Sequence, residues 1–196
     1  PEIIKAVFEK YHPQVVFHAA AYKHVPMLEH FPYEALRVNI SGTLCVAKFA
    51  GIYDAERFVL ISTDKAVNPS SIMGASKRVC ELFLHTLSNQ GSYKTLFTSV
   101  RFGNVLGSRG SVIPTFNRQI ESGGPVTITD AAMTRYFMSI PEAVNLILHA
   151  ACLTKGDDIY MLKMGEVVGI VELAERMIRM RGLGPNIDIP IKYTGI

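Results

Sequence analysis

Two short polar stretches of this sequence carry side chains that could move protons. Ser62-Thr63-Asp64-Lys65 follows an apolar run, and Met73-Gly74-Ala75-Ser76-Lys77 opens a stretch with helical spacing. Met73 and Lys77 are four residues apart, so on a helix they share a face. If that face meets the end of a strand, a hydroxyl, a carboxylate and two amines converge, and such a set can give or take protons. The residues alone fit a solvated Asp–Lys pair at a helix entry equally well.

The elements that must position these side chains alternate between helix and strand. The short apolar run at 15–18 is typical of a strand buried on both faces, and further strands are expected at 58–62 and 96–102. A further short strand is expected at 159–163. Apolar residues at helical spacing predict helices from residue 3 to the stop at Pro13 and over 33–50, 72–89, 141–153 and 170–180.

This alternation predicts an α/β fold, a doubly wound parallel sheet of the Rossmann-like type in which the first three strands are parallel neighbours. After Gly103, Gly and Pro residues divide the chain into shorter pieces, which indicates a smaller C-terminal substrate-binding region. We therefore place the boundary between residues 1–103 and 104–196. Ligands of such sheets bind beyond the carboxyl ends of the strands. The loops that begin at Ala19, Ser62 and Gly103 should then hold the chemistry.

Composition excludes several classes of protein. The 196 residues are 48% hydrophobic with a net charge of +3, and the basic residues are scattered, so no nucleic-acid partner is expected. No apolar run reaches the roughly 18 residues that a membrane-spanning helix needs. Three widely separated cysteines indicate reduced thiols and a cytoplasmic location. The histidines at 18, 24 and 30 share no helical face with Glu29, so we expect no metal site.

Longer motifs give this sequence a family resemblance. His18-Ala19-Ala20-Ala21-Tyr22-Lys23-His24-Val25-Pro26, Ile61-Ser62-Thr63-Asp64-Lys65-Ala66-Val67-Asn68-Pro69, Met73-Gly74-Ala75-Ser76-Lys77-Arg78 and the stretch 101–114 resemble the CapD-like polysaccharide-biosynthesis family. That family comprises UDP-N-acetylglucosamine 4,6-dehydratases and close relatives, which are extended short-chain dehydrogenases/reductases. The likeness covers nearly the whole chain.

The resemblance implies an NAD-dependent reaction on a UDP-sugar. Oxidation at C4 acidifies the C5 proton, water is eliminated across C5 and C6, and the hydride returns to C6. On this resemblance Asp64 is the acid, Lys65 the C5 base and Thr63 a hydrogen-bond partner of the C4 oxygen. Lys77 holds the nicotinamide ribose. Lys65 can act as a base only if burial or the neighbouring Lys77 lowers its pKa towards ~7–8.

The same resemblance implies two sets of binding residues. Those expected at the cofactor are Ala19, Ala20, Ala21, Lys23, Asn39, Ser62 and Lys77. Those expected at the nucleotide-sugar are Asn104, Gly110, Ser111, Val112 and Arg135. Backbone amides of a Gly/Ser loop and an arginine fork suit phosphate oxygens. The residues alone fit a simple glycine turn and a surface arginine just as well.

Met73 departs from the Tyr-x-x-x-Lys pattern of short-chain dehydrogenases. A thioether cannot carry the proton, so the base for C4 oxidation is left open between Asp64 and a bound water. The membrane-anchored branch of the family resembles this sequence in having Met there. We therefore expect a catalytic group of residues that includes Met73 for shape, a parent anchored at the inner membrane with this part in the cytoplasm, and a homo-oligomer.

No G-x-G-x-x-G motif occurs in the sequence, although that turn cradles the pyrophosphate in this fold. We therefore expect a fragment whose N-terminal cofactor-binding part is missing. Residues 191–196 resemble the start of a family motif that normally continues, so we also expect a truncated C-terminus. Such a fragment should bind NAD weakly and be inactive by itself. A related nucleotide-sugar epimerase or reductase, or a noncatalytic sugar-nucleotide-binding module, are the alternatives.

Overall fold

The computed structural model describes residues 1–108, 111–162 and 166–195. The chain folds into two compact units, of which the first combines Pro1–Phe102 with Val144–Leu162. The second combines Gly103–Ala143 with Lys163–Ile196. The expected boundary at residue 103 is therefore close to the first crossing point. The chain then returns to the first unit for residues 144–162. The expected division into 1–103 and 104–196 had only one boundary and therefore missed this return.

The first unit is built on a parallel sheet with the strand order β1-β2-β3-β7. Its strands are β1 (Val15–His18), β2 (Arg57–Ile61), β3 (Leu96–Arg101) and β7 (Asp158–Met161). All three neighbouring pairs are parallel, which confirms the predicted Rossmann-like α/β fold and the predicted pairing of the first three strands. Since His18 lies opposite Leu60, and Ile61 opposite Val100, the strands end at one common edge.

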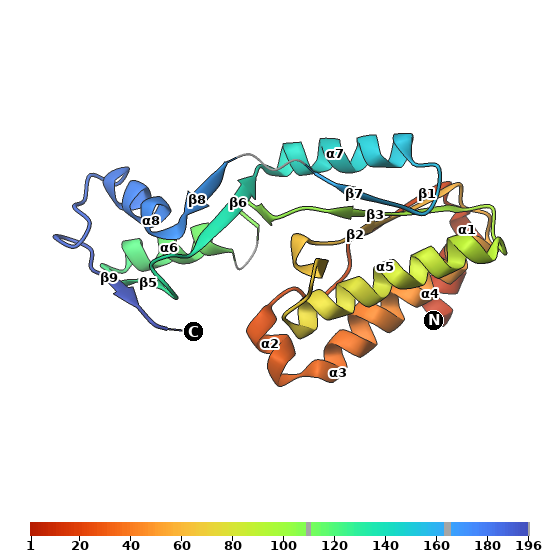
Figure 1. Ribbon diagram of the computed structural model, residues 1–196, viewed down its shortest axis with the longest axis horizontal. Coiled ribbons are helices and arrows are strands. Elements are labelled where there is room, and N and C mark those ends of the chain that lie inside the picture. The colour runs from red at the N-terminus through yellow and green to blue at the C-terminus, as the bar shows by residue number, and fades with distance from the viewer. Residues whose placement is uncertain (109–110, 163–165, 196) are drawn as a thin grey trace. The chain divides into compact units, whose positions relative to one another are not determined.

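Helices cover both faces of this sheet (Figure 1). On one side lie α1 (Glu2–Tyr11), α4 (Gly42–Ile52) and α5 (Ile72–Gln90), and on the other α7 (Ile140–Leu153). Phe58, Leu60 and Phe97 are almost fully buried beneath the first group. Each such side chain contributes roughly 1.5–3 kcal/mol by burial.

The predicted helices are present within one or two residues, but the segment 19–52 differs. The expected loop 19–32 contains a short helix α2 (Val25–His30), whose second residue, Pro26, is tolerated in a first turn because no N–H is needed there. The expected helix 33–50 consists of α3 (Pro32–Glu34), the π-helical segment η1 (Ala35–Ser41) and α4. Hydrophobic spacing cannot reveal the wider π turn, because the apolar residues still fall on one side.

The second unit has shorter elements. Strands β4 (Asn104–Val105), β6 (Thr134–Met138) and β8 (Val167–Gly169) form one sheet, and β5 (Val126–Ile128) pairs with β9 (Ile191–Tyr193). Helices α6 (Val112–Glu121) and α8 (Ile170–Arg179) share a core with the β5–β9 pair. No helix in the described ranges has the length and apolar character to cross a bilayer.

Candidate active site

A tight turn follows strand β2 and carries three of the expected catalytic residues. The 3₁₀ segment η2 (Asp64–Ala66) begins directly after Thr63. The Thr63 hydroxyl and the Lys65 ammonium both donate to Asp64 Oδ1, each at 2.9 Å. The Asp64 amide donates to the Phe102 carbonyl oxygen at 3.1 Å, which fixes the turn to the end of β3. The hydroxyl, carboxylate and ammonium are therefore in one hydrogen-bonded group.

Helix α5 begins against this turn. Gly74 allows the approach, because a Cβ there would overlap the Lys65 carbonyl oxygen. The Ser71 hydroxyl accepts from the Gly74 amide at 3.2 Å, and Glu29 of α2 accepts from the Ile72 amide at 2.8 Å. An N-cap oxygen satisfies amides that lack partners within the helix. The first turn of α5 is thus held from two sides.

Lys77 and Met73 lie on the face of α5 that is turned inwards. Lys77 is 7% exposed, and its ammonium donates to the Ile61 carbonyl oxygen at 2.7 Å. Burial lowers the pKa of Lys77, while Cys80 and Glu81 act in the opposite direction. Met73 is buried and packs with Leu28 and Ala35. The structure thus brings Lys77 to the end of β2, whereas Met73 fills the contact between α5 and α2.

The loop after β1 presents the small residues that were expected at a cofactor. Ala19 and Ala20 are exposed, Ala21 is half-buried and Lys23 is exposed. Asn39 of η1 holds this loop, since its side chain accepts from the Tyr22 amide at 2.8 Å and donates to the Tyr22 carbonyl oxygen at 3.0 Å.

Asn39 was expected to contact the cofactor, but its side chain is 1% exposed. Its remaining N–H donates to the Ser76 hydroxyl at 3.0 Å. All hydrogen-bonding groups of the amide are therefore engaged within the protein. The structure assigns Asn39 to shaping the loop, which is an indirect role.

Glu81 is a charged residue at the site that the sequence reasoning missed. Its side chain is fully buried one turn beyond Lys77. It accepts from the Ser62 hydroxyl at 2.6 Å, from Arg101 Nε and Nη2 at 2.8 and 2.6 Å, and from Arg78 at 3.1 Å. Ser62, expected at the cofactor, therefore directs its hydroxyl inwards. Two features of the sequence could have indicated the role of Glu81. It lies four residues after Lys77 on the same helix, and Arg101 ends the neighbouring strand.

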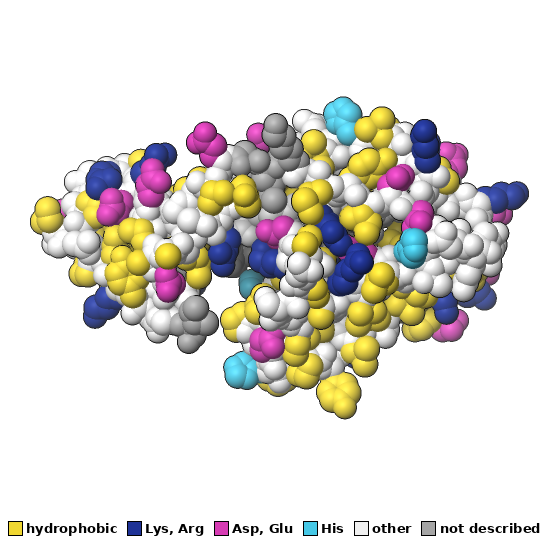
Figure 2. Space-filling view, in the orientation of Figure 1, with side chains coloured by type: hydrophobic (Ala, Val, Ile, Leu, Met, Phe, Trp, Pro, Cys, Tyr) yellow, Lys and Arg dark blue, Asp and Glu magenta, His cyan; other side chains and the backbone are white. Residues whose placement is uncertain are grey.

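These contacts decide the charge of Glu81. Burial raises the pKa of its carboxyl, but hydrogen bonds from Arg101, Ser62 and Arg78 outweigh burial, and the net pKa lies below the ordinary value. The carboxylate stays ionised and paired. Figure 2 shows Lys and Arg side chains gathered between helix α5 and the sheet, with acidic side chains beside them.

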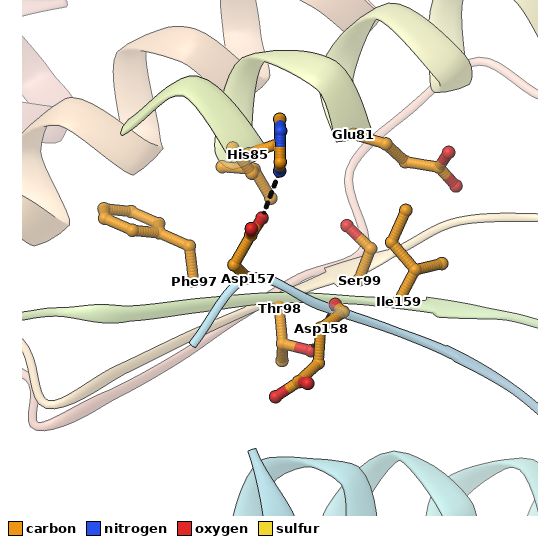
Figure 3. Close-up of a pocket in the computed structure, with 9 residues that line it drawn as sticks. Glu81, His85, Phe97, Thr98, Ser99, Asp157, Asp158 and Ile159 are labelled. Atoms are coloured by element: carbon orange, nitrogen blue, oxygen red, sulfur yellow. Dashed lines mark hydrogen bonds and ion pairs between the residues drawn. The ribbon is translucent and has the colours of Figure 1, made fainter. Parts of the chain in front are cut away.

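A second polar cluster lies further along α5, in a shallow pocket (Figure 3). His85 points to Asp157, with Nδ1 and Oδ1 2.6 Å apart. The Glu81 side chain points away from this pair. The pair joins α5 to the start of β7 and contains none of the expected site residues. In the described ranges no group of three His, Cys, Asp or Glu residues could hold a metal ion.

The expected substrate residues lie in the second unit. Asn104 of β4 pairs with Phe137 of β6, and Arg135 lies two residues earlier in β6. Arg135 donates to the Thr134 carbonyl oxygen at 2.7 Å. Ser111 and Val112 begin helix α6. Gly110 lies outside the described residues.

Two curated relatives share more than half of their aligned residues with this chain. A probable polysaccharide biosynthesis protein EpsC of Bacillus subtilis is 55% identical over 190 residues, or 97% of this chain and 31% of the relative. The capsular polysaccharide biosynthesis protein CapD of Staphylococcus aureus is 54% identical over 193 residues, or 98% and 32%. The chain thus spans about a third of the length of these relatives. A UDP-glucose 4-epimerase of Rickettsia canadensis is 42% identical over 161 residues, or 81% of the chain and 47% of the relative.

Solved structures repeat the fold. Pen from Bacillus thuringiensis superimposes with a TM-score of 0.92 at 37% identity, covering 100% of this chain and 60% of that protein. DesIV of Streptomyces venezuelae, a dTDP-glucose 4,6-dehydratase with NAD bound, has a TM-score of 0.84 at 18% identity, over 96% of this chain and 64% of DesIV. That second likeness concerns the fold alone. The family model described as "polysaccharide biosynthesis protein" matches residues 1–196, so the chain belongs to the polysaccharide biosynthesis protein family.

Proposed function

We propose that this chain is the catalytic portion of an NAD-dependent nucleotide-sugar 4,6-dehydratase that acts on UDP-N-acetylglucosamine. The observation that carries the proposal is the hydrogen-bonded group of Thr63, Asp64 and Lys65 at the carboxyl end of β2. Ligands bind at this end of doubly wound sheets. A carboxylate and an amine in contact match the two proton transfers that an elimination of water needs.

The residues around β1 and β2 fit NAD. Small exposed side chains at Ala19 and Ala20 let a ligand approach the backbone, and Asn39 fixes that loop. Lys77 uses one of its three N–H bonds on Ile61, so the others can hold a ribose. When bound, NAD supplies the acceptor that takes the C4 hydride and returns it at C6. Proteins of this fold such as DesIV contain NAD, which supports the assignment.

The Asp64–Lys65 pair can carry out both proton transfers of the elimination of water. Transfer of a proton from Lys65 Nζ to Asp64 along their 2.9 Å contact leaves a neutral amine and a carboxylic acid. The amine takes the C5 proton, and the C5–H electron pair becomes the C5–C6 double bond. As the C6–O bond breaks, Asp64 protonates the departing hydroxyl, which leaves as water. The pair ends as ammonium and carboxylate, its starting state.

Thr63 and the expected nucleotide-sugar residues have proposed roles of their own. The Thr63 hydroxyl holds the C4 oxygen of the sugar. Asn104, Ser111, Val112 and Arg135 bind the nucleotide diphosphate, for which an arginine fork is suited. A membrane anchor elsewhere in the full-length protein and a homo-oligomer stay predictions.

An NAD-dependent epimerase is the second candidate, because the Rickettsia relative is named as a UDP-glucose 4-epimerase. Inversion at C4 needs hydride removal and return at the same carbon. It needs neither a base at C5 nor an acid at C6. The contact between Asp64 and Lys65 therefore favours the dehydratase.

The test is to incubate the full-length protein with NAD and UDP-N-acetylglucosamine labelled with deuterium at C4. We expect a 4-keto-6-deoxy product that has lost one water and carries the deuterium at C6. A C4 epimer without loss of water would support the second candidate. Binding of the sugar nucleotide without any turnover would contradict both enzymes and indicate a noncatalytic module.

A further inference from the structure

We propose that Glu81 is a positioning residue, which holds the proton-transferring turn in place through Ser62 and Arg101. The inference rests on the proposed function of that turn. Glu81 touches none of the reacting groups. From helix α5, its contacts reach the end of β2 and the end of β3, two of the elements that form the candidate site.

The Ser62 contact acts on the residue next to Thr63. The hydroxyl donates to Glu81 Oε1 at 2.6 Å, and the Ser62 amide donates to the Val100 carbonyl oxygen at 2.8 Å. Both the backbone and the side chain of Ser62 are therefore fixed just before the turn. A short hydrogen bond to a buried charge is stronger than one between neutral groups.

The Arg101 contact acts on the other side of the turn. Arg101 binds both Glu81 oxygens through Nε and Nη2, a geometry that fixes direction as well as distance. The carbonyl oxygen of the next residue, Phe102, accepts a hydrogen bond from the Asp64 amide. Glu81 thus fixes both strand ends that hold Thr63 and Asp64.

A purely structural role would be satisfied by an apolar pair of similar volume, since such replacements of buried ion pairs are often neutral for stability. A positioning role would not, because Ser62 would lose its acceptor. Arg78 can turn to solvent in such a variant, as its side chain is already 37% exposed.

The decisive variants are Ser62→Ala and the pair Glu81→Met with Arg101→Leu, made in the full-length protein. We expect both to lower kcat by about 10- to 100-fold, as for a small misplacement of reacting groups. The melting temperature of the double variant should exceed that of Glu81→Met alone, while its kcat should stay low. Recovery of kcat together with stability would overturn the positioning role.

Two control variants separate positioning from general damage. Thr98→Val removes another buried hydroxyl of the same sheet, which donates to the Asp158 carbonyl oxygen. His85→Ala removes another link between α5 and the sheet, the contact with Asp157 at the start of β7 (Figure 3). Both should lower stability and change kcat by no more than about twofold, which corresponds to about 0.4 kcal/mol of activation free energy. A loss of kcat in these controls equal to that of Ser62→Ala would also overturn the inference.

Hydrogen–deuterium exchange distinguishes this inference from the proposed function. Ser62→Ala should speed exchange in the peptide that covers 62–66, and Thr98→Val should not. Unchanged exchange at 62–66 in Ser62→Ala would contradict the positioning role, whichever reaction the protein catalyses. Faster exchange in a protein without dehydratase activity would support the positioning role and refute the proposed function alone.

Discussion

The two units hold their candidate site residues in different ways. In the first, Asp64 accepts two side-chain hydrogen bonds and Lys77 is anchored on a strand carbonyl. In the second, Arg135 donates to the carbonyl oxygen of its neighbour Thr134. The buried polar bonds of the first unit fix directions, as reacting groups require. The bond of Arg135 to its own neighbour fixes the guanidinium to no other element.

The largest effect is expected from Lys65→Ala in the full-length protein. We expect turnover to fall by ~10²-fold or more, as for a lost general base. Product formation from UDP-N-acetylglucosamine measures it. Met73→Ala is the matched variant on α5 and should lose much less, because Met73 contributes packing and no proton. Full activity in Lys65→Ala would remove Lys65 from the mechanism.

A second test uses the histidines, since all six lie in the first unit. Burial, with a smaller contribution from Lys77, lowers the pKa of His18 to about 4. The unfolded chain, with a pKa near ~6.5, then binds more protons than the folded one as the pH falls from about 6.5 to 4. The contribution of neutral His18 to the free energy of unfolding is fully present above pH ~6.5. It should be lost as the pH falls to about 4, which lowers that free energy by up to about 3 kcal/mol.

Urea unfolding at pH 7, 5 and 4 measures that loss, and His18→Gln is the control that should flatten the profile. Exchange measured by peptide should show the first unit opening before the second. Equal acid sensitivity of His18→Gln and the unchanged protein would contradict the assignment to His18.

A third test concerns the approach of α5 to the turn. Gly74→Ala places a Cβ against the Lys65 carbonyl oxygen, so the helix start must move. We expect a loss of about 1–3 kcal/mol in the free energy of unfolding, as for other overpacked sites. Gly42→Ala in α4 has no atom within 4 Å of the new Cβ and should stabilise by about 0.4–1 kcal/mol. Similar changes in the free energy of unfolding for Gly74→Ala and Gly42→Ala would show that the close approach of α5 to the Lys65 carbonyl oxygen does not affect stability.

The units also differ in how far the sequence predicts them. An apolar run such as Phe58–Ile61 is long enough to indicate a strand, and Ser62–Lys65 could be placed at its end from position alone. The network around Glu81 could not, because spacing does not say which charged residues become buried partners. In the second unit, the two-residue strand β4 and three-residue β5 carry no measurable periodicity. Their pairing depends on contacts distant in sequence.

The smallest expected effect falls in the second unit, at Arg135. If Arg135 binds the diphosphate, Arg135→Ala should raise KM for the UDP-sugar about tenfold, the loss of roughly one charged hydrogen bond. kcat should change little, because the binding is the same in ground and transition states. Arg179→Ala is the control, since Arg179 forms an exposed pair with Glu175 in the same unit and should leave KM unchanged. A fall in kcat at constant KM would place Arg135 among the fixed groups instead, and the contrast between the two units would no longer hold.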